Sequence, residues 1–249
     1  MRVALVTHAL QFAGPPAVEA LTKEGFLVFA TDAAFEDPAA RAAFEAQHPQ
    51  GVALAASKQP NPLLQAILSA RGRLDVLISN DVHPVVHAPI EEVTEAQRVA
   101  TFEALVYAPF RLLQAAVPIF KRQGQGRIVM ITSCRTALTQ PGGALPDMAR
   151  AAANALVRSL AIELAPHGVP VNAIAPNFLY SESYHPRARF IDDAEGQAYV
   201  ARTVPAGRLG QPAELGELVR YLAVGAGSFH TGSVIDFAGG WPAGTARPT

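Results

Sequence analysis

Short apolar runs alternate with stretches of helical periodicity along the whole chain. We interpret the runs as buried strands because polar or turn-forming residues bound each of them. They span residues 3–7, 26–30, 52–54, 74–79, 128–131, 169–175 and 233–237. The intervening helices are predicted over residues 17–21, 38–48, 62–70, 94–122, 146–165 and 212–222. In the longest helix we expect a bend or break near Pro109 and again near Pro118, because proline removes a helical hydrogen bond.

Strands that alternate with helices at this spacing predict a parallel sheet covered by helices on both faces. The first unit runs from a strand ending at Thr7 through a turn at Gly14 into a helix, which is typical of a dinucleotide-type fold. We therefore expect an α/β protein with a single Rossmann-like, doubly wound parallel sheet. No low-complexity tract or internal repeat offers a domain boundary, so residues 1–249 are predicted to form one domain.

Composition narrows the class of ligand. Charged residues make up 16% of the 249 residues against 50% hydrophobic, and the net charge is -1. This balance argues against a nucleic-acid partner or a polybasic membrane anchor and favours a small-molecule ligand. The single cysteine, Cys134, allows no internal disulfide. The apolar start of the chain is too short for a signal peptide and no run approaches membrane-spanning length, so we expect a cytoplasmic protein.

The run over residues 128–131 leads into the residues that organise the chemistry of the chain. It places Thr132 and Ser133 at the carboxyl end of a strand, where open α/β sheets bind their ligands. The next helix is predicted to begin at Pro146, since proline is favoured at the first helical position. Arg150 then lies about one turn into this helix and can face back toward the strand end. The sequence thus predicts that the serine and the arginine converge on one site.

This spacing resembles that of the short-chain dehydrogenase/reductase superfamily, and specifically its halohydrin dehalogenase branch. Members carry a serine after this strand, a tyrosine thirteen residues later and a basic residue four beyond the tyrosine. The dehalogenases have arginine where the dehydrogenases have lysine. Ser133 and Arg150 match the pattern, but Pro146 stands at the tyrosine position. The resemblance covers essentially the whole chain, including Arg208-Leu-Gly and residues 232–240 near its end.

The turn after the first predicted strand departs from the nucleotide-binding pattern of this superfamily. Dinucleotide-binding members carry Thr-Gly, three residues and then Gly-Ile-Gly, because glycine lets the backbone approach the pyrophosphate. Here His8 and Phe12 replace the first two glycines, and only Gly14 remains. Asp32, after the second strand, would suit a ribose hydroxyl, although an aspartate there also commonly caps a turn. We expect no nicotinamide cofactor, and no metal, since His8 has no second ligand at metal spacing.

The resemblance implies displacement of halide from a vicinal haloalcohol to give an epoxide, and the reverse opening of epoxides by small anions. In the dehalogenases the tyrosine accepts the hydroxyl proton, the arginine lowers the pKa of that tyrosine, and the serine binds the substrate oxygen. A pocket of backbone amides and aromatic rings holds the leaving halide. Its expected residues here are Phe12, Asn80, Asp81, Pro176, Asn177, Phe178 and Leu179. The family also implies a homotetramer.

Pro146 cannot exchange a side-chain proton, and three explanations stay open. In the first, a neighbour among Asp147, Tyr180 and Tyr184 replaces the tyrosine as the base. Loss of a positioned base otherwise costs roughly 10²- to 10⁴-fold in rate. In the second, the protein binds an anion or epoxide through the serine and the arginine with poor turnover. In the third, it is a non-catalytic, ligand-binding member. The alternative activity is that of an NAD(P)-dependent oxidoreductase, which the missing glycines and tyrosine disfavour.

The remaining chemistry-bearing residues have simpler interpretations. Residues 176–190 form a long, aromatic segment where a substrate lid would lie. His83 and His87 could line the mouth of the pocket, although a solvated loop position is the default expectation for both. Cys134 is expected to be a small buried residue and not a nucleophile. Trp241 is expected to pack on the pocket or across a subunit interface.

Overall fold

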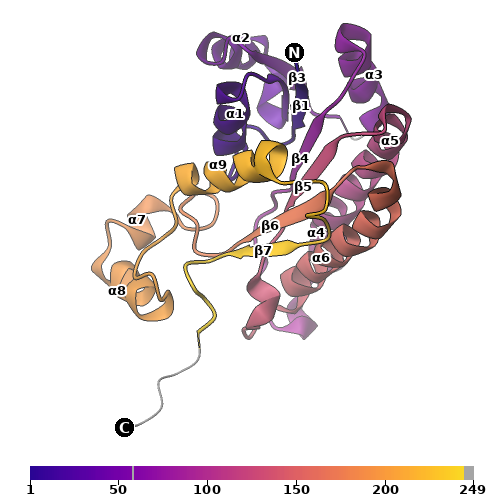
Figure 1. Cartoon of the computed structure of the whole chain (residues 1–249). Coiled ribbons are helices and arrows are strands. Elements are labelled where there is room, and N and C mark those ends of the chain that lie inside the picture. Colours follow the sequence, from indigo (N-terminus) through magenta and orange to yellow (C-terminus); the bar gives the residue numbers. More distant parts are fainter. Residues whose placement is uncertain (58, 244–249) are drawn as a thin grey trace.

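The computed structural model describes residues 1–57 and 59–243. Within these residues, all strands join one parallel sheet in the order β3-β2-β1-β4-β5-β6-β7 (Figure 1). The strands are β1 (Val3–Val6), β2 (Leu27–Asp32), β3 (Gly51–Ala55), β4 (Val76–Asn80), β5 (Arg127–Ile131), β6 (Val171–Pro176) and β7 (Val234–Phe237). The strand order reverses between β1 and β4, which confirms the doubly wound, Rossmann-like fold expected from the sequence.

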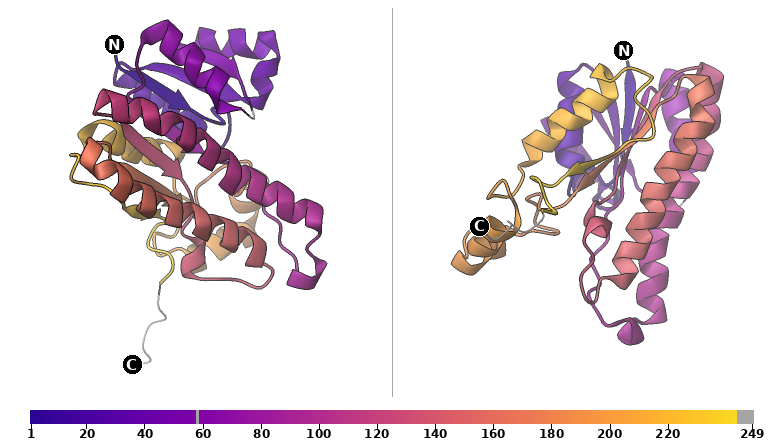
Figure 2. Two further views of the ribbon diagram at one scale, coloured as in Figure 1. Left: turned by 90° about the vertical axis from the view of Figure 1, so that its right-hand side faces the viewer. Right: turned by 60° about the horizontal axis from the view of Figure 1, so that its bottom comes forward.

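Helices cover both faces of the sheet (Figure 2, right). One face carries α1 (Gly14–Lys23), α2 (Pro38–Gln47) and α9 (Pro212–Arg220), and the other carries α3 (Pro60–Arg71), α4 (Glu95–Phe102), α5 (Ala108–Gln123) and α6 (Ala144–Leu164). Two separate hydrophobic cores result, one on each side. Because both faces are covered, β1, β2, β4 and β6 are buried along their whole length, and their sequences are almost continuously apolar.

The helical region predicted over residues 94–122 is divided once. Helix α4 ends at Phe102, and a π turn over Glu103–Tyr107 joins it to α5. This interruption comes just before Pro109, near one of the two expected positions. Pro118 lies inside α5, which continues through it, so of the bend or break expected there the helix has no break. The buried face of α5 packs along the core and outweighs the loss of one helical hydrogen bond.

Two further boundaries differ from the prediction. Helix α6 begins at Ala144, so Pro146 is its third residue and not its first. The sequence predicts no helix between residues 175 and 212, yet α7 (Arg187–Phe190) and α8 (Ala194–Thr203) form a lobe beyond the carboxyl edge of the sheet (Figure 1). Only two residues of α8 are buried, so its hydrophobic periodicity is weak. No helix in the described part of the chain has the length and apolar character needed to cross a membrane.

Gly14, the glycine retained in the first turn, packs directly against backbone. A Cβ added there would lie 2.3 Å from the carbonyl oxygen of His8. We expect Gly14→Ala to lower the melting temperature by several degrees, because overpacking costs about 1–3 kcal/mol and each kcal/mol shifts a chain of this size by about 2–4 °C. Gly227→Ala is the control, since no atom lies within 4 Å of its added Cβ. Thermal unfolding that shows equal melting temperatures for G14A and G227A would contradict this close packing.

Candidate active site

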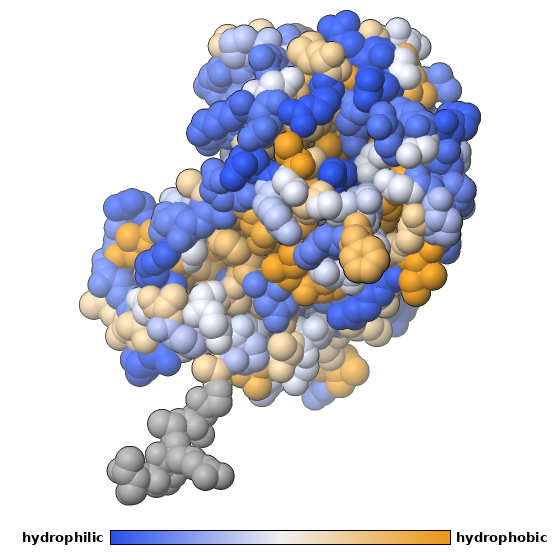
Figure 3. Space-filling view, in the orientation of Figure 1, coloured by the Kyte–Doolittle hydropathy of each residue, from blue (hydrophilic) through white to orange (hydrophobic). Residues whose placement is uncertain are grey.

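A cavity of about 820 Å³ lies beyond the carboxyl ends of β4, β5 and β6. It is lined by Ser133 after β5, by Pro146 and Arg150 of α6, by the loop over residues 83–87, and by part of the segment over residues 176–202 together with Trp241. In the space-filling view, hydrophobic side chains gather between the α7–α8 lobe and the body of the sheet (Figure 3). The cavity therefore occupies the edge of the sheet at which doubly wound folds bind their ligands.

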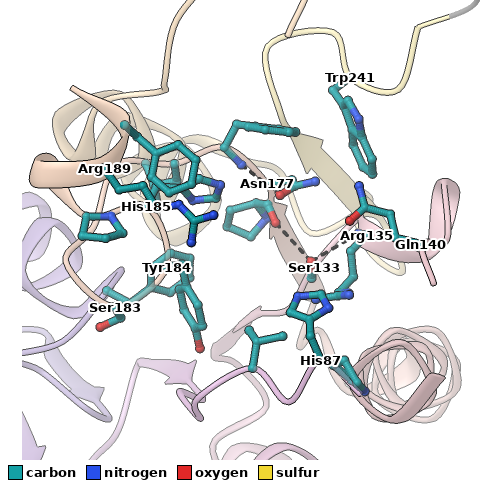
Figure 4. Close-up of a pocket in the computed structure, with 18 of the residues that line it drawn as sticks. His87, Ser133, Arg135, Gln140, Asn177, Ser183, Tyr184, His185, Arg189 and Trp241 are labelled. Carbon is teal, nitrogen blue, oxygen red and sulfur yellow. Dashed lines mark hydrogen bonds between the residues drawn. The ribbon is translucent and has the colours of Figure 1, made fainter. Parts of the chain in front are cut away.

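Ser133 is held by contacts on both sides of its side chain. Its Oγ donates to the carbonyl oxygen of Pro176 at 3.2 Å and accepts from the backbone N–H of Arg135 at 3.2 Å (Figure 4). From α6, Asn154 Nδ2 donates to the Ser133 carbonyl oxygen at 3.0 Å and fixes the backbone. Both Oγ contacts are long for a hydroxyl group. A substrate oxygen can therefore replace either partner at small cost.

Arg150 reaches from α6 to the ends of two neighbouring strands. Its Nη1 donates to the carbonyl oxygen of Ile131 at 3.4 Å, and its Nη2 donates to that of Asp81 at 3.1 Å. The residue is only 7% exposed. Ser133 and Arg150 thus line the same cavity, as their spacing in the sequence predicts. Their catalytic roles stay predictions.

Pro146 lines this cavity at the position of the family's tyrosine. As the third residue of α6 it lacks an N–H group at a position where an N–H has no intrahelical partner, so the helix loses little. Its ring presents only apolar surface to the cavity. The helix therefore forms normally around this residue, and a proton acceptor has to come from another element.

Two of the sequence candidates for a replacement base are occupied elsewhere. Asp147 is buried and forms an ion pair with Arg135. The Tyr180 hydroxyl donates to Glu182 at 2.7 Å, and this contact raises the pKa of Tyr180. Neither Asp147 nor Tyr180 is among the residues that line the cavity. The structure thus offers no contact that would let either take a proton from a bound substrate.

Tyr184, the third candidate, does line the cavity. Its hydroxyl donates to the carbonyl oxygen of His83 at 3.1 Å and accepts from the His83 N–H at 3.2 Å. Its ring meets the Phe12 ring edge-on, with 4.8 Å between centroids. The tyrosine therefore ties the loop after β4 to the segment after β6, and both sides of its hydroxyl are already bonded.

The segment implied as a halide pocket follows β6, and Pro176, Asn177, Phe178 and Leu179 all line the cavity. The Asn177 N–H donates to the carbonyl oxygen of Phe237 at 3.1 Å. The Phe178 N–H donates to the Asn177 side chain at 3.0 Å. These two amides are therefore engaged within the protein, and an anion that binds them has to displace those partners.

Aromatic rings surround Phe178 at this end of the cavity. Its ring centroid lies 5.4 Å from that of His185, 6.1 Å from Tyr199 and 5.8 Å from Trp241. Burial lowers the pKa of His185 to about 4, so this imidazole is neutral near pH 7. Trp241 is buried and packs on the cavity, which is one of the two placements expected for it. Together these rings provide a largely uncharged surface.

Asn80 and Asp81 are buried at the end of β4 and do not line the cavity. The Asn80 Nδ2 donates to the carbonyl oxygens of His8 at 3.0 Å and Gln11 at 2.9 Å. Burial raises the pKa of Asp81 to about 6, although a hydrogen bond from Ser79 and nearby positive charge oppose the shift. In this structure the two residues support the surrounding loops, and a direct role in halide binding stays a prediction.

The turn between β1 and α1 keeps the backbone shape of a glycine-rich loop while carrying bulky side chains. His8 and Phe12, at two glycine positions of the family, have φ angles of 46° and 49°. This left-handed region costs non-glycine residues of the order of 1–2 kcal/mol each. The Phe12 side chain lines the cavity. A ring therefore stands where a nucleotide-binding member leaves space.

Asp32, the candidate for a ribose contact, binds backbone N–H groups of the protein instead. Its Oδ2 accepts from the Leu10 N–H at 3.1 Å, and its Oδ1 accepts from the Ala34 N–H at 3.1 Å. It thereby caps the short 3₁₀ turn over Ala33–Glu36. Capping is the alternative that the sequence left open for this aspartate, and it engages both carboxylate oxygens.

The first turn of α1 has lost the N–H groups that bind phosphate. The Gly14 N–H donates to the carbonyl oxygen of Gln11 at 2.8 Å, and the Ala17 N–H donates to that of Ala13 at 3.2 Å. Between them stand Pro15-Pro16, which have no N–H. Phosphate binding at a helix N-terminus depends on free N–H groups. The residues of this turn therefore do not fit the pyrophosphate of a dinucleotide.

His83 and His87, on the loop after β4, both line the cavity. Burial and the charge of Arg150 lower the pKa of His83, which is half-buried. His87 is exposed, and Figure 4 shows its imidazole pointing into the cavity on the side of Ser133. Both histidines therefore line the pocket, the alternative that the sequence analysis offered to a solvated loop position.

Several cavity residues carry no motif and escape sequence reasoning, among them Arg135, Gln140, His185 and Tyr199. They come from the loop after β5 and from the α7–α8 lobe, whose paths no local pattern specifies.

Cys134 is buried, and burial raises the pKa of its thiol to about 12, as suits a structural cysteine. Among the described residues, no group of three or more His, Cys, Asp or Glu is placed to hold a metal.

A family model described as enoyl-(acyl carrier protein) reductase matches residues 14–242. The chain belongs to the short-chain dehydrogenase/reductase family. Within this short-chain dehydrogenase/reductase family, an uncharacterized oxidoreductase of Methylorubrum extorquens is 33% identical over 96% of this chain and 97% of its own length. Human dehydrogenase/reductase SDR family member 4 is 29% identical over 72% of this chain and 64% of its own length.

Solved structures of the short-chain dehydrogenase/reductase fold include two dehalogenases similar to this chain. One, titled a dehalogenation enzyme, has a TM-score of 0.91 and 36% identity over 96% of this chain and 98% of that one. A halohydrin dehalogenase bound to ethyl (2S)-oxiran-2-ylacetate has a TM-score of 0.94 and 34% identity over 99% and 100% of the two chains. An NADPH-dependent reductase involved in bacilysin biosynthesis has a TM-score of 0.85 and 25% identity over 96% and 97%. The family membership inferred from the sequence is thereby confirmed.

The buried carboxyl group of Asp81 should make stability depend on pH. Its folded pKa of about 6 exceeds the ordinary aspartate value of about 3.9. As pH rises between these values, the unfolded chain loses this proton before the folded chain does. Asp81 therefore destabilises the fold increasingly over this range, and the full cost remains above about pH 6. Asp81→Asn removes that cost. Its melting temperature relative to the parent should therefore be a few degrees higher at pH 8 than at pH 4.5.

Thermal unfolding at the two pH values measures this difference. Glu91→Gln, at an exposed carboxylate outside the cavity, is the matched control. An Asp81→Asn effect that is the same at pH 4.5 and pH 8 would show that the carboxyl group titrates normally in the fold.

Proposed function

We propose that the protein converts vicinal haloalcohols to epoxides and halide, and opens epoxides with small anions in the reverse direction. One observation carries the proposal: the turn that would bind a dinucleotide lacks the space and the free N–H groups for it, and it borders a cavity that holds a serine and an arginine. Phe12 fills the turn, and Pro15-Pro16 remove N–H groups from α1. Ser133 and Arg150 line the cavity that remains. A reaction without hydride transfer is compatible with this arrangement.

The reaction needs three things that these residues can supply or leave room for. The substrate oxygen needs a hydrogen-bond partner, and Ser133 Oγ has two exchangeable contacts of 3.2 Å. The alkoxide character that develops on this oxygen needs positive charge, and the buried guanidinium of Arg150 is held at the same edge of the sheet. The leaving halide needs a weakly hydrated site, which the rings around Phe178 provide.

The two dehalogenase structures support the proposal, because their TM-scores and identities exceed those of the NADPH-dependent reductase described above. One of them binds an epoxide that carries an ester. We propose substrates of this size class, a small haloalcohol or epoxide with a short polar substituent, for the cavity of about 820 Å³. The halide or another small anion is the second ligand.

A second candidate function is an NAD(P)-dependent oxidoreductase. It is favoured by the curated relatives, including the one at 33% identity over nearly the full chain, which are named as oxidoreductases. The bonded amides of Gln11 and Gly14 and the occupied carboxylate of Asp32 argue against it. The two activities are separable by experiment.

Halide release from a panel of vicinal chloro- and bromoalcohols tests the leading proposal. The parent protein should release halide, and Ser133→Ala should lower kcat/KM by at least about tenfold, because a hydrogen bond to a developing charge contributes at least about 1.4 kcal/mol. Ser159→Ala, on the exposed side of α6 and outside the cavity, should match the parent. Circular dichroism checks that each variant is folded. Failure of the parent to release halide from any member of the panel would refute the proposal.

Nucleotide binding separates the two candidate functions. We expect 1 mM NADPH to leave the melting temperature unchanged. If the protein bound NADPH with a dissociation constant about a hundredfold below this concentration, binding would add about 2.7 kcal/mol of stability and raise the melting temperature. Thermal shift with NADH and NADPH measures this directly. A clear upward shift accompanied by NADPH oxidation on addition of a carbonyl substrate would favour the oxidoreductase instead.

A further inference from the structure

The proposed reaction needs a proton acceptor beside the substrate hydroxyl, and Pro146 has none. The titratable side chains that line the cavity and can accept a proton are His83, His87, Tyr184, His185, Asp193, Glu195 and Tyr199. Five of them lie on the segment after β6 that leads into and through α8, namely Tyr184, His185, Asp193, Glu195 and Tyr199. Asp193 caps α8 by accepting from the Gly196 N–H at 2.8 Å, and Tyr199 packs with Phe178. The loop after β4 is therefore the natural source of a base.

Three cavity side chains are poor acceptors for stated reasons. The Tyr184 hydroxyl is bonded on both sides to the backbone of His83. His185 is buried among rings, and its pKa of about 4 makes it a weak base. His83 is half-buried, and its burial, together with the charge of Arg150, lowers the pKa of this imidazole. His87, in contrast, lines the cavity and is exposed.

We propose that His87 is the general base of haloalcohol dehalogenation in this protein and replaces the tyrosine that Pro146 displaces. The inference rests on the proposed function. His87 lines the cavity together with Ser133 and Pro146, and its imidazole points into the cavity from the loop after β4 (Figure 4). The imidazole is also exposed, so its proton can pass to water after each turnover.

A backbone contact holds the loop that carries His87 beside the loop that enters α6. The N–H of Ala88, the next residue, donates to the carbonyl oxygen of Gly142 at 3.1 Å. Gly142 lies in the loop that enters α6, four residues before Pro146. It has a φ of 76°, and a Cβ there would lie 3.2 Å from the Ala88 nitrogen. The two backbones therefore pack closely, and this contact fixes the loop that carries the imidazole beside the start of α6.

The proton and electron pairs balance without any further reactant. The lone pair of the neutral imidazole accepts the proton of the substrate hydroxyl. The oxygen then forms a C–O bond to the adjacent carbon while the C–halogen bond breaks and its electron pair leaves with the halide ion. The imidazolium returns its proton to water, which restores the neutral base. Ser133 holds the oxygen throughout, and Arg150 stabilises its negative charge.

An imidazole base also changes what the arginine has to do. A phenol, with an ordinary pKa near 10, needs an adjacent cation to become a base at neutral pH, whereas an imidazole, near 6.5, does not. Arg150 is bonded to the backbone carbonyls of Ile131 and Asp81 and not to a cavity phenol. This arrangement suits a base that lies on another element and needs no adjacent cation to accept a proton.

The test compares His87→Gln with two other histidine variants in the halide-release assay. His87→Gln should lower kcat by at least about 10²-fold, the usual contribution of a positioned base. His167→Gln, at an exposed histidine after α6, should match the parent. His83→Gln removes the other histidine of the loop and should cost much less than His87→Gln. Circular dichroism and melting temperature confirm that each variant is folded.

Two readouts separate a base from a residue that only maintains the loop. The kcat/KM of the parent should rise with pH along a limb that is absent in His87→Gln. In His87→Ala, added imidazole should restore part of the lost kcat. Ser133→Ala should keep the pH limb while losing rate.

Each outcome decides one of the two proposals. Halide release by the parent that persists in His87→Gln with an unchanged pH profile overturns the role of His87 and leaves the proposed function standing. A loss of halide release that is confined to His83→Gln assigns the base to His83 and also overturns the role of His87. No halide release by the parent on any haloalcohol overturns the proposed function, and the role of His87 with it.

Discussion

The buried charge of Arg150 is the constraint around which the carboxyl edge of this sheet is built. A guanidinium that is 7% exposed needs acceptors for its N–H groups, because an unpaired buried charge costs several kcal/mol. Here the acceptors are the carbonyl oxygens of Ile131 and Asp81, at the ends of two adjacent strands. The arginine therefore fixes the spacing of β4 and β5 as well as placing positive charge beneath Ser133. The Asp81 carboxyl group is also buried here, within reach of the charge of Arg150.

The first turn keeps the backbone path of a glycine-rich loop while it presents different groups to a ligand. Gly14 remains because backbone of His8 leaves no room for a Cβ, a purely structural requirement. The glycine positions now held by His8 and Phe12 keep their left-handed φ angles, so the path of the chain is preserved at some energetic cost. What changes is the set of groups presented to a ligand. Free amides are replaced by internal hydrogen bonds, and open space is replaced by the Phe12 ring.

The sequence predicts the parts of this molecule that depend on local patterns. Fully buried strands are recognisable because both faces of the sheet are covered, and the fixed spacing of Ser133 and Arg150 follows from a strand and the helix after it. The passage of α5 through Pro118 escapes prediction because packing along the whole helix overrides a local penalty. The pairing of Asp147 with Arg135 and of Tyr184 with His83 depends on how long loops cross, which no periodicity encodes. The choice among candidate bases therefore required the three-dimensional contacts.

The absence of a tyrosine from α6 and the presence of a histidine on the facing loop can be understood together. In the proposed reaction a base must reach the substrate oxygen beside Ser133, so it has to come from an element that borders the carboxyl edge. Helix α6 and the loop after β4 meet there, since Ala88 is bonded to Gly142. A proton acceptor can thus move from one element to the other without moving the substrate. Because imidazole needs no neighbouring cation, the move also frees Arg150 to serve the oxygen and the strand ends alone. The fold tolerates the exchange because neither Pro146 nor His87 contributes a contact on which the hydrophobic cores depend.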